Sequence, residues 1–185
     1  LKTYGGDLAI GAYGIVNRII FLFIMIVMGF NQGMQPIAGY NFGAKQYDRL
    51  IQVLKYTAFC GVTVTTIGFL AGELFPRPLI YLFTSDETLI NIAVEGLRIV
   101  LIVFPVVGFQ MVTSSFFQSI GMAKKAIFLS LTRQLLFLIP SLLIFPSLWG
   151  TVGVWMSMPV ADVIATVVAT FMLRRQLKLL GVKEI

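Results

Sequence analysis

The sequence predicts an all-α, polytopic membrane helix bundle of about five transmembrane helices. Hydrophobic residues make up 58% of the 185 residues and charged residues only 12%, whereas soluble domains carry about 25% charged residues. The apolar residues gather into five stretches, each long enough to cross a bilayer as a helix of about 20 residues. Basic and non-basic connections alternate between these stretches, as antiparallel crossings require. The lipid bilayer is therefore the expected solvent.

The first apolar stretch covers residues 8–38, which is longer than one straight crossing needs. Either its hydrocarbon part is residues 19–38, or the helix tilts or bends. Residues 75–83 contain two prolines that end the next helix, and we expect Tyr81 and Phe83 to hold this segment at the outer interface. The other four stretches are residues 53–75, 96–118, 126–145 and 152–173.

The distribution of basic residues predicts the orientation. One side of the membrane holds only four basic residues and the acidic loop 84–91. The four are Lys2, Arg18, Arg77 and Arg98. Cytoplasmic loops carry an excess of lysine and arginine, which places the N-terminus outside and the C-terminus in the cytoplasm. The other ten basic residues define the cytoplasmic side: Lys45, Arg49, Lys55, Lys124, Lys125, Arg133, Arg174, Arg175, Lys178 and Lys183.

Several function classes are excluded by what the sequence lacks. The net charge of +6 reflects membrane orientation, and no basic helix stands free of a span to bind nucleic acid. There is no histidine, and the one cysteine, Cys60, has no second thiol to share a metal. Zinc-protease, nucleophile-elbow and phosphate-loop motifs are also missing. We expect no enzymatic activity, no cofactor and no metal site.

The third stretch is a candidate for the interrupted helix that carries substrate or ion sites in secondary transporters. Pro105 and Gly108 flank its centre, and proline removes a backbone donor and kinks a helix. Gln110, Ser114 and Gln118 follow at spacings of four residues, with Thr113 beside them, so they share one stripe of the helix: Gln110, Thr113, Ser114 and Gln118. This stripe forms either hydrogen bonds between helices or one wall of a substrate cavity.

Asp162 lies at the centre of the last stretch, shortly after Pro159. A charged side chain there costs about 2.5–3.5 kcal/mol on insertion scales. It serves either as a proton, cation or substrate site or as a structural hydrogen-bond partner of a neighbouring helix. We expect Arg133, near the cytoplasmic end of the fourth stretch, to snorkel or to pair with loop groups. On the outer side, Glu73 and Arg77 are expected to meet across the interfacial turn.

The end of the first stretch is polar and contains a proline. Gln35 and Pro36 precede Asn41 and Gly43, and glycine at Gly43 and Gly121 is expected to supply the left-handed conformation that ends a helix. The polar end acts either as a gate or only in packing and helix termination. The candidates for helix breaking or gating are Gln35, Pro36, Asn41, Gly43, Pro105 and Gly108.

Residues 35–45, QPIAGYNFGAK, resemble the signature of the second half of MATE (multidrug and toxic compound extrusion) transporters. Further segments on both sides of it also match, in the order expected for the family: residues 4–7, 12–18, 82–86, 118–121, 133–134 and 153–162. The resemblance implies a twelve-helix fold of two six-helix lobes. It implies that residues 1–185 hold helices eight to twelve, a partial C-terminal lobe, without helix seven and the N-terminal lobe.

The resemblance also implies a function. Such transporters sit in the cell membrane and export organic cations in exchange for H⁺ or Na⁺ by alternating access. Some use a carboxylate on helix ten, but residues 96–118 contain no acidic residue, which favours an ion site in the N-terminal lobe. Two alternatives stay open. One is a related flippase for lipid-linked oligosaccharides, which would need basic residues at the midplane, and the other is a non-transporting membrane subunit.

Overall fold

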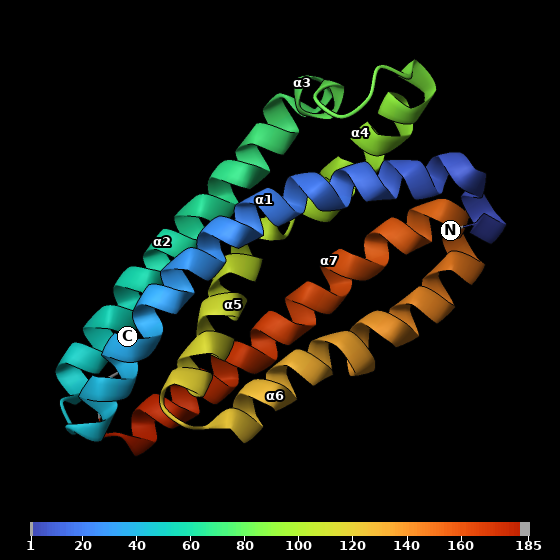
Figure 1. Cartoon of the computed structure of the whole chain (residues 1–185). Coiled ribbons are helices and arrows are strands. Elements are labelled where there is room, and N and C mark those ends of the chain that lie inside the picture. The colour runs from blue at the N-terminus through green and yellow to red at the C-terminus, as the bar shows by residue number, and fades with distance from the viewer. Residues whose placement is uncertain (1, 182–185) are drawn as a thin grey trace.

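The computed structural model describes residues 2–181, with side chains from residue 6 onward (Figure 1). All of the regular structure in this range is helical. Leu1 and residues 182–185, which include the predicted cytoplasmic Lys183, lie outside the described residues. The side chain of Lys2 also lies outside them. Within the described range, the helices pack into an elongated bundle (Figure 1).

Helix α1 spans Lys2–Gly43, with a non-helical residue at Gly6. Its 38-residue part, Gly6–Gly43, would measure about 57 Å if straight, so the first stretch is indeed longer than a bilayer core of about 30 Å. Figure 1 shows α1 curving along the bundle. Pro36 lies inside the helix without a non-helical dihedral. The left-handed residue at its end is Lys45, with φ 56°, and not Gly43, whereas Gly121 has the expected positive φ of 74°.

Helix α2 spans Tyr47–Leu74 and ends at Phe75, directly before the short helix α3, Pro76–Tyr81. The helix is interrupted at this proline-containing segment, as predicted. The side chains of Leu82 and Phe83, which follow α3, are exposed. The ion pairs differ from the prediction. Glu73 approaches Arg98 at 3.8 Å, and Arg77 donates to Asn91 Oδ1 at 2.8 Å instead of meeting Glu73.

The third predicted stretch is a broken helix. Helix α4 spans Glu87–Leu101, and the side chain of Asp86 caps it by accepting from the backbone of Thr88 at 2.8 Å. Helix α5 spans Phe104–Ser119, and the two axes differ by 55°. Pro105 is the second residue of α5, where proline is tolerated because no intrahelical donor is needed. The proline therefore marks the break at the predicted place.

The last 57-residue helical segment folds back on itself. Helix α6 (Ala123–Leu131), the π-helix η1 (Thr132–Leu138) and helix α7 (Ile139–Leu179) follow one another. As one straight rod they would measure about 85 Å. Gly150 has φ 57° and ψ −132°, and Figure 1 shows the chain reversing so that the second half of α7 runs antiparallel to α6 and η1. The reversal matches the predicted connection near residues 146–151.

Length and hydropathy mark three candidate spans among the described residues, or four if α4 and α5 form one bent span. Because the longest candidate, Ala123–Leu179, turns back at Gly150, it supplies two crossings. The arrangement thus agrees with the predicted bundle of about five transmembrane helices. Many large apolar side chains on its outside are exposed, including Phe59, Leu143 and Phe171. A surface of this kind is expected where lipid, not water, surrounds the protein.

The core consists of two clusters, one toward each end of the bundle. One joins the C-terminal half of α1 to α2, α5 and the end of α7 around Met34, Phe116 and Phe117. The other joins the N-terminal half of α1 to α3, α4 and Trp155, with the rings of Tyr13 and Trp155 5.7 Å apart. Polar side chains lie between and beside these clusters, and they form the candidate site.

Candidate functional site

A cavity of about 410 Å³ lies between α1, α5 and the α6–η1 segment. Most of its lining side chains are amides and hydroxyls, and none of the described lining residues is acidic. We call it the polar cavity. Most of its uncharged polar residues come from α1 and α5, and two come from α6 and η1: Asn31, Gln32, Gln35, Gln110, Ser114, Ser115, Gln118, Ser130 and Gln134.

The stripe predicted on α5 provides one wall of this cavity. Gln110, Ser114 and Gln118 all line it, because residues four apart project from the same side of a helix. Ser114 Oγ also lies 3.5 Å from Ser130 Oγ on α6, so the stripe makes one of the predicted interhelical contacts as well. Thr113 does not line the polar cavity, since it is buried and donates to the carbonyl of Phe109 at 2.9 Å.

Two amide oxygens in the lining have no hydrogen-bond donor among the described residues. They are Asn31 Oδ1 and Gln110 Oε1, and the two residues are only 4% and 5% exposed. A buried acceptor left unpaired costs about 1–3 kcal/mol, so such groups are usually satisfied. Both oxygens are themselves buried, so they are unsatisfied acceptors beside the polar cavity and not groups exposed in it.

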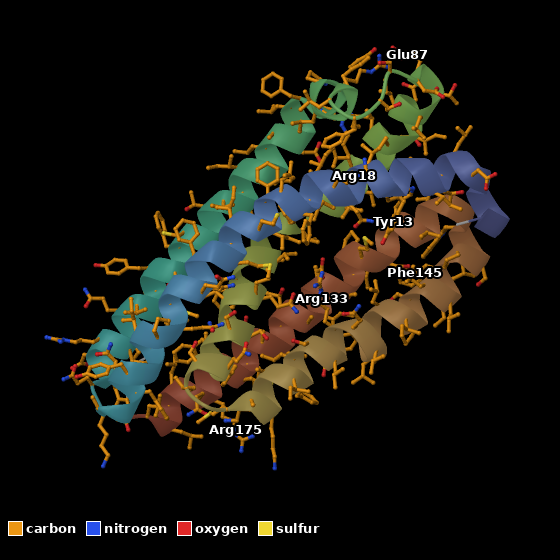
Figure 2. The ribbon with its side chains drawn as sticks, viewed as in Figure 1. Tyr13, Arg18, Glu87, Arg133, Phe145 and Arg175 are labelled. Atoms are coloured by element: carbon orange, nitrogen blue, oxygen red, sulfur yellow. The ribbon has the colours of Figure 1, made fainter. Side chains whose placement is uncertain are left out.

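Asp162 forms an ion pair with Arg133, whose Nε lies 2.5 Å from Asp162 Oδ1. The prediction that Arg133 snorkels or pairs with a loop is therefore wrong. Arg133 lies ten residues into the α6–η1 helix, about 15 Å from its start, which is near mid-membrane. Figure 2 places it midway along the bundle, between Glu87 near one end and Arg175 near the other.

The two partners differ in exposure. The Asp162 side chain is 7% exposed and the Arg133 side chain 41%. Arg133 lines the polar cavity and also a second cavity of about 130 Å³, whose lining includes Asp162, Asn17 and Met158. Arg133 thus lines both cavities, whereas Asp162 lines only the second one. Sequence analysis missed this pair because 29 residues separate its members.

Gly108 is a packing residue in this structure and not a visible hinge. A methyl group added there would lie 2.5 Å from the carbonyl oxygen of Gly61 and 2.6 Å from Thr65 Oγ1. Small residues of this kind allow membrane helices to approach closely. Thr65 also donates to the carbonyl of Pro105 at 3.2 Å, so the backbone beside the α4–α5 break is tied to α2.

Of the four gating candidates at the end of α1, only Gln35 lines the polar cavity. Pro36 does not line it, and Asn41 is buried and donates to the carbonyl of Ile37 at 2.8 Å. Gly43 is the last residue of α1. The gating role of these four residues stays a prediction. No cluster of three metal-ligating side chains occurs among the described residues.

Comparison with known proteins decides the family. The sequence model of the MatE family matches residues 1–143 of this chain. The chain belongs to the MATE family. It is therefore a multi-pass membrane protein of a transporter family and not an enzyme.

Curated relatives of this MATE chain are multidrug exporters. It is 26% identical over 174 residues to the multidrug export protein MepA of Staphylococcus haemolyticus (strain JCSC1435), and 25% identical over 175 residues to MepA of Staphylococcus aureus (strain N315). These alignments cover 92% and 93% of this chain. They cover only 37% and 38% of the relatives, so the chain spans less than half of their length.

Solved MATE structures share the fold. The multidrug transporter DinF-BH in complex with R6G is 38% identical, with a TM-score of 0.85 over 99% of this chain and 41% of its own. An inward-facing and an outward-facing MATE transporter, both 23% identical, give TM-scores of 0.89 and 0.90 over 97% of this chain. The predicted helical membrane fold is thereby confirmed.

Proposed function

We propose that this chain is the larger part of the C-terminal lobe of a secondary multidrug exporter, and that the polar cavity is its share of the substrate site. The observation that carries the proposal is the cavity itself. Three helical segments of a membrane bundle border a cavity of about 410 Å³ lined with amides and hydroxyls, and two of the lining residues have a buried amide oxygen without a partner among the described residues. Secondary transporters place their substrates near the bilayer midplane in such sites.

We propose that the intact transporter exports organic cations in exchange for H⁺ or Na⁺. The MepA relatives are named as multidrug export proteins, which supports drug-like substrates. None of the described residues that line the polar cavity is acidic, and the intramembrane carboxylate of Asp162 is already paired with Arg133. This favours a coupling carboxylate in the N-terminal lobe. The candidate substrate contacts here are Gln110, Ser114 and Gln118.

The experiment is a transport assay on the complete reading frame that contains this chain. Proteoliposomes are loaded with a cationic dye, and dye release is measured under an imposed proton or sodium gradient. We expect release that depends on one of these gradients. Release under neither gradient would contradict the exporter proposal and would leave a non-transporting membrane subunit as the better interpretation.

A matched pair of variants tests the polar cavity in the same assay. Gln110→Ala removes a buried amide of the lining, whereas Gln52→Ala makes the same change at an exposed position on α2. We expect Gln110→Ala to slow gradient-dependent dye release about fivefold or more, in the range of a lost hydrogen bond, and Gln52→Ala to leave it unchanged. Equal effects would mean that the polar cavity is not the substrate site.

A further inference from the structure

Four basic side chains lie at the end of the bundle where α6 begins and α7 ends. Lys124 and Lys125 belong to the first turn of α6, and Arg174 and Arg175 belong to the last two turns of α7. A hydrogen bond of 2.6 Å from Lys125 Nζ to Gln176 Oε1 joins the two helix ends. Figure 2 shows Arg175 at this end of the bundle. We call these four basic residues the basic corner.

No neighbouring carboxylate in the described chain offsets the charge of the basic corner. Residues 119–138 and 163–181 contain no acidic residue. Lys125 is held instead by a neutral amide, because Gln176 is only 3% exposed and accepts its hydrogen bond. The ammonium nitrogen of Lys125 also lies 5.6 Å from the centre of the Phe117 ring. These contacts position Lys125 without neutralising it, and they use only one of its three N–H donors.

The basic corner lies at the depth of lipid headgroups. Arg174 follows the turn at Gly150 by 24 residues, so the second half of α7 measures about 36 Å to this point. The hydrocarbon core of a bilayer is about 30 Å thick. Lys124 and Lys125 begin the antiparallel segment beside it (Figure 1). The four positive groups therefore lie just beyond one face of the hydrocarbon layer, level with lipid phosphates.

Exposed apolar side chains continue from the basic corner toward the membrane interior. On α6, Phe128 is 49% exposed and lies one turn after Lys124. On α7, Phe171 is 68% exposed and lies one turn before Arg174 and Arg175. Residues three and four apart are neighbours on a helix surface, so each helix presents a cation beside an apolar side chain. An anionic head with apolar chains matches this arrangement, whereas a soluble anion would use only the cations.

We propose that the basic corner is a binding site for an anionic phospholipid. The lipid phosphate accepts hydrogen bonds from Lys125, which Gln176 holds in place, and from the other three basic side chains. The acyl chains lie along Phe128 and Phe171. Lysine and arginine clusters beside membrane helices attract anionic lipids, and arginine donates two parallel hydrogen bonds to phosphate. A lipid bound in this way bridges the start of α6 and the end of α7.

A photo-crosslinker at position 171 reports which lipid occupies the site. The complete protein, with a benzophenone amino acid in place of Phe171, is reconstituted in vesicles of equimolar phosphatidylglycerol and phosphatidylcholine. Mass spectrometry then counts the crosslinked lipids. We expect about fivefold more phosphatidylglycerol than phosphatidylcholine. The same crosslinker at Leu143, which is 73% exposed in the first half of α7, should capture both lipids about equally. Equal capture at position 171 would overturn the proposal.

Two matched double variants distinguish a site from the general charge of this end of the bundle. Lys124→Gln with Arg175→Gln removes two exposed charges of the basic corner. Arg49→Gln with Lys55→Gln removes the same two kinds of charge from α2, whose Cα atoms lie more than 8 Å from those of α6 and α7. We expect the lipid preference at position 171 to fall below twofold in the first variant and to stay near fivefold in the second. An unchanged preference in the first variant, or equal losses in both, would overturn the site.

Soluble glycerol phosphate separates a lipid site from a site for free phosphate esters. It carries the phosphate of the headgroup without the acyl chains. Added in excess to the vesicles, it should leave the preference for phosphatidylglycerol at position 171 unchanged. Loss of the preference would assign the basic corner to soluble phosphate esters and overturn the lipid proposal.

Discussion

At the scale of single residues, the pairing of Asp162 with Arg133 determines how both are interpreted. Each charge alone would be costly in mid-membrane, and a 2.5 Å contact lets each offset the other. The sequence shows two isolated charges on different stretches. Only the reversal at Gly150 and the register of the resulting hairpin bring them together. Because Arg133 is the partner of Asp162, mutation can distinguish a structural role of this carboxylate from a role in ion coupling.

We predict that Asp162→Asn is tolerated and that Asp162→Ala is not. Asparagine keeps the shape and an acceptor for Arg133 Nε, whereas alanine removes both. Removing one partner of a buried ion pair costs about 3–5 kcal/mol, and the exposure of Arg133 lowers that cost here. Expression and thermal unfolding of the complete protein in detergent measure the difference. Normal expression with dye efflux lost in Asp162→Asn would instead assign Asp162 to ion coupling.

At the scale of the elements, the sequence predicted where helices stop better than how they pack. Prolines marked the C-terminal end of α2 and the start of α5, because the missing backbone N–H of proline interrupts a helix at that position. The left-handed residue after α1 was misplaced by two positions, at Lys45 instead of Gly43. Gly108 was read as a candidate hinge, yet its role depends on Gly61 and Thr65 of another helix. Contacts between distant segments leave no local pattern in one sequence.

The close crossing of α2 and α5 leads to a prediction about Gly108. Gly108→Ala places a methyl group 2.5 Å from the Gly61 carbonyl oxygen, and crowding a packed contact costs about 1–3 kcal/mol. Gly29→Ala is the matched control, since a methyl group there meets nothing within 4 Å and alanine favours the helix by up to about 1 kcal/mol. We expect a lower unfolding temperature for the first variant and not for the second. Equal unfolding temperatures would mean that the helices do not approach this closely.

At the scale of the whole molecule, the basic residues predict an orientation that no comparison tests. Apart from Arg133, which lies midway along the bundle, the described cytoplasmic candidates gather where α1 meets α2, where α5 meets α6, and at the end of α7. The fold brings these connections to one end of the bundle, opposite α3 and the start of α4 (Figure 1). Because the three connections lie at the same end of one folded bundle, they must lie on the same side of the membrane.

Cysteine labelling of an otherwise cysteine-free complete protein tests this orientation. Single cysteines at Lys45 and Lys124 should react with a membrane-impermeant maleimide only when the cytoplasmic face is open. A single cysteine at Asp86 should react in intact cells, because it lies at the other end of the bundle. If all three positions were labelled from the same side, the alternating crossings would be wrong. If the pattern were reversed, only the orientation would be wrong.

The last prediction concerns what these residues do in isolation. The chain matches 41% of DinF-BH and 37% of the MepA relative from Staphylococcus haemolyticus, and it matches inward-facing and outward-facing MATE structures almost equally, with TM-scores of 0.89 and 0.90. In secondary transporters, alternating access moves one repeat or bundle against another around the substrate site. We therefore predict that residues 1–185 alone, reconstituted in proteoliposomes, carry out no drug-dependent proton or sodium flux. The complete protein, assayed in parallel, is the control. Flux from the isolated chain above empty liposomes would contradict the division of function between two lobes.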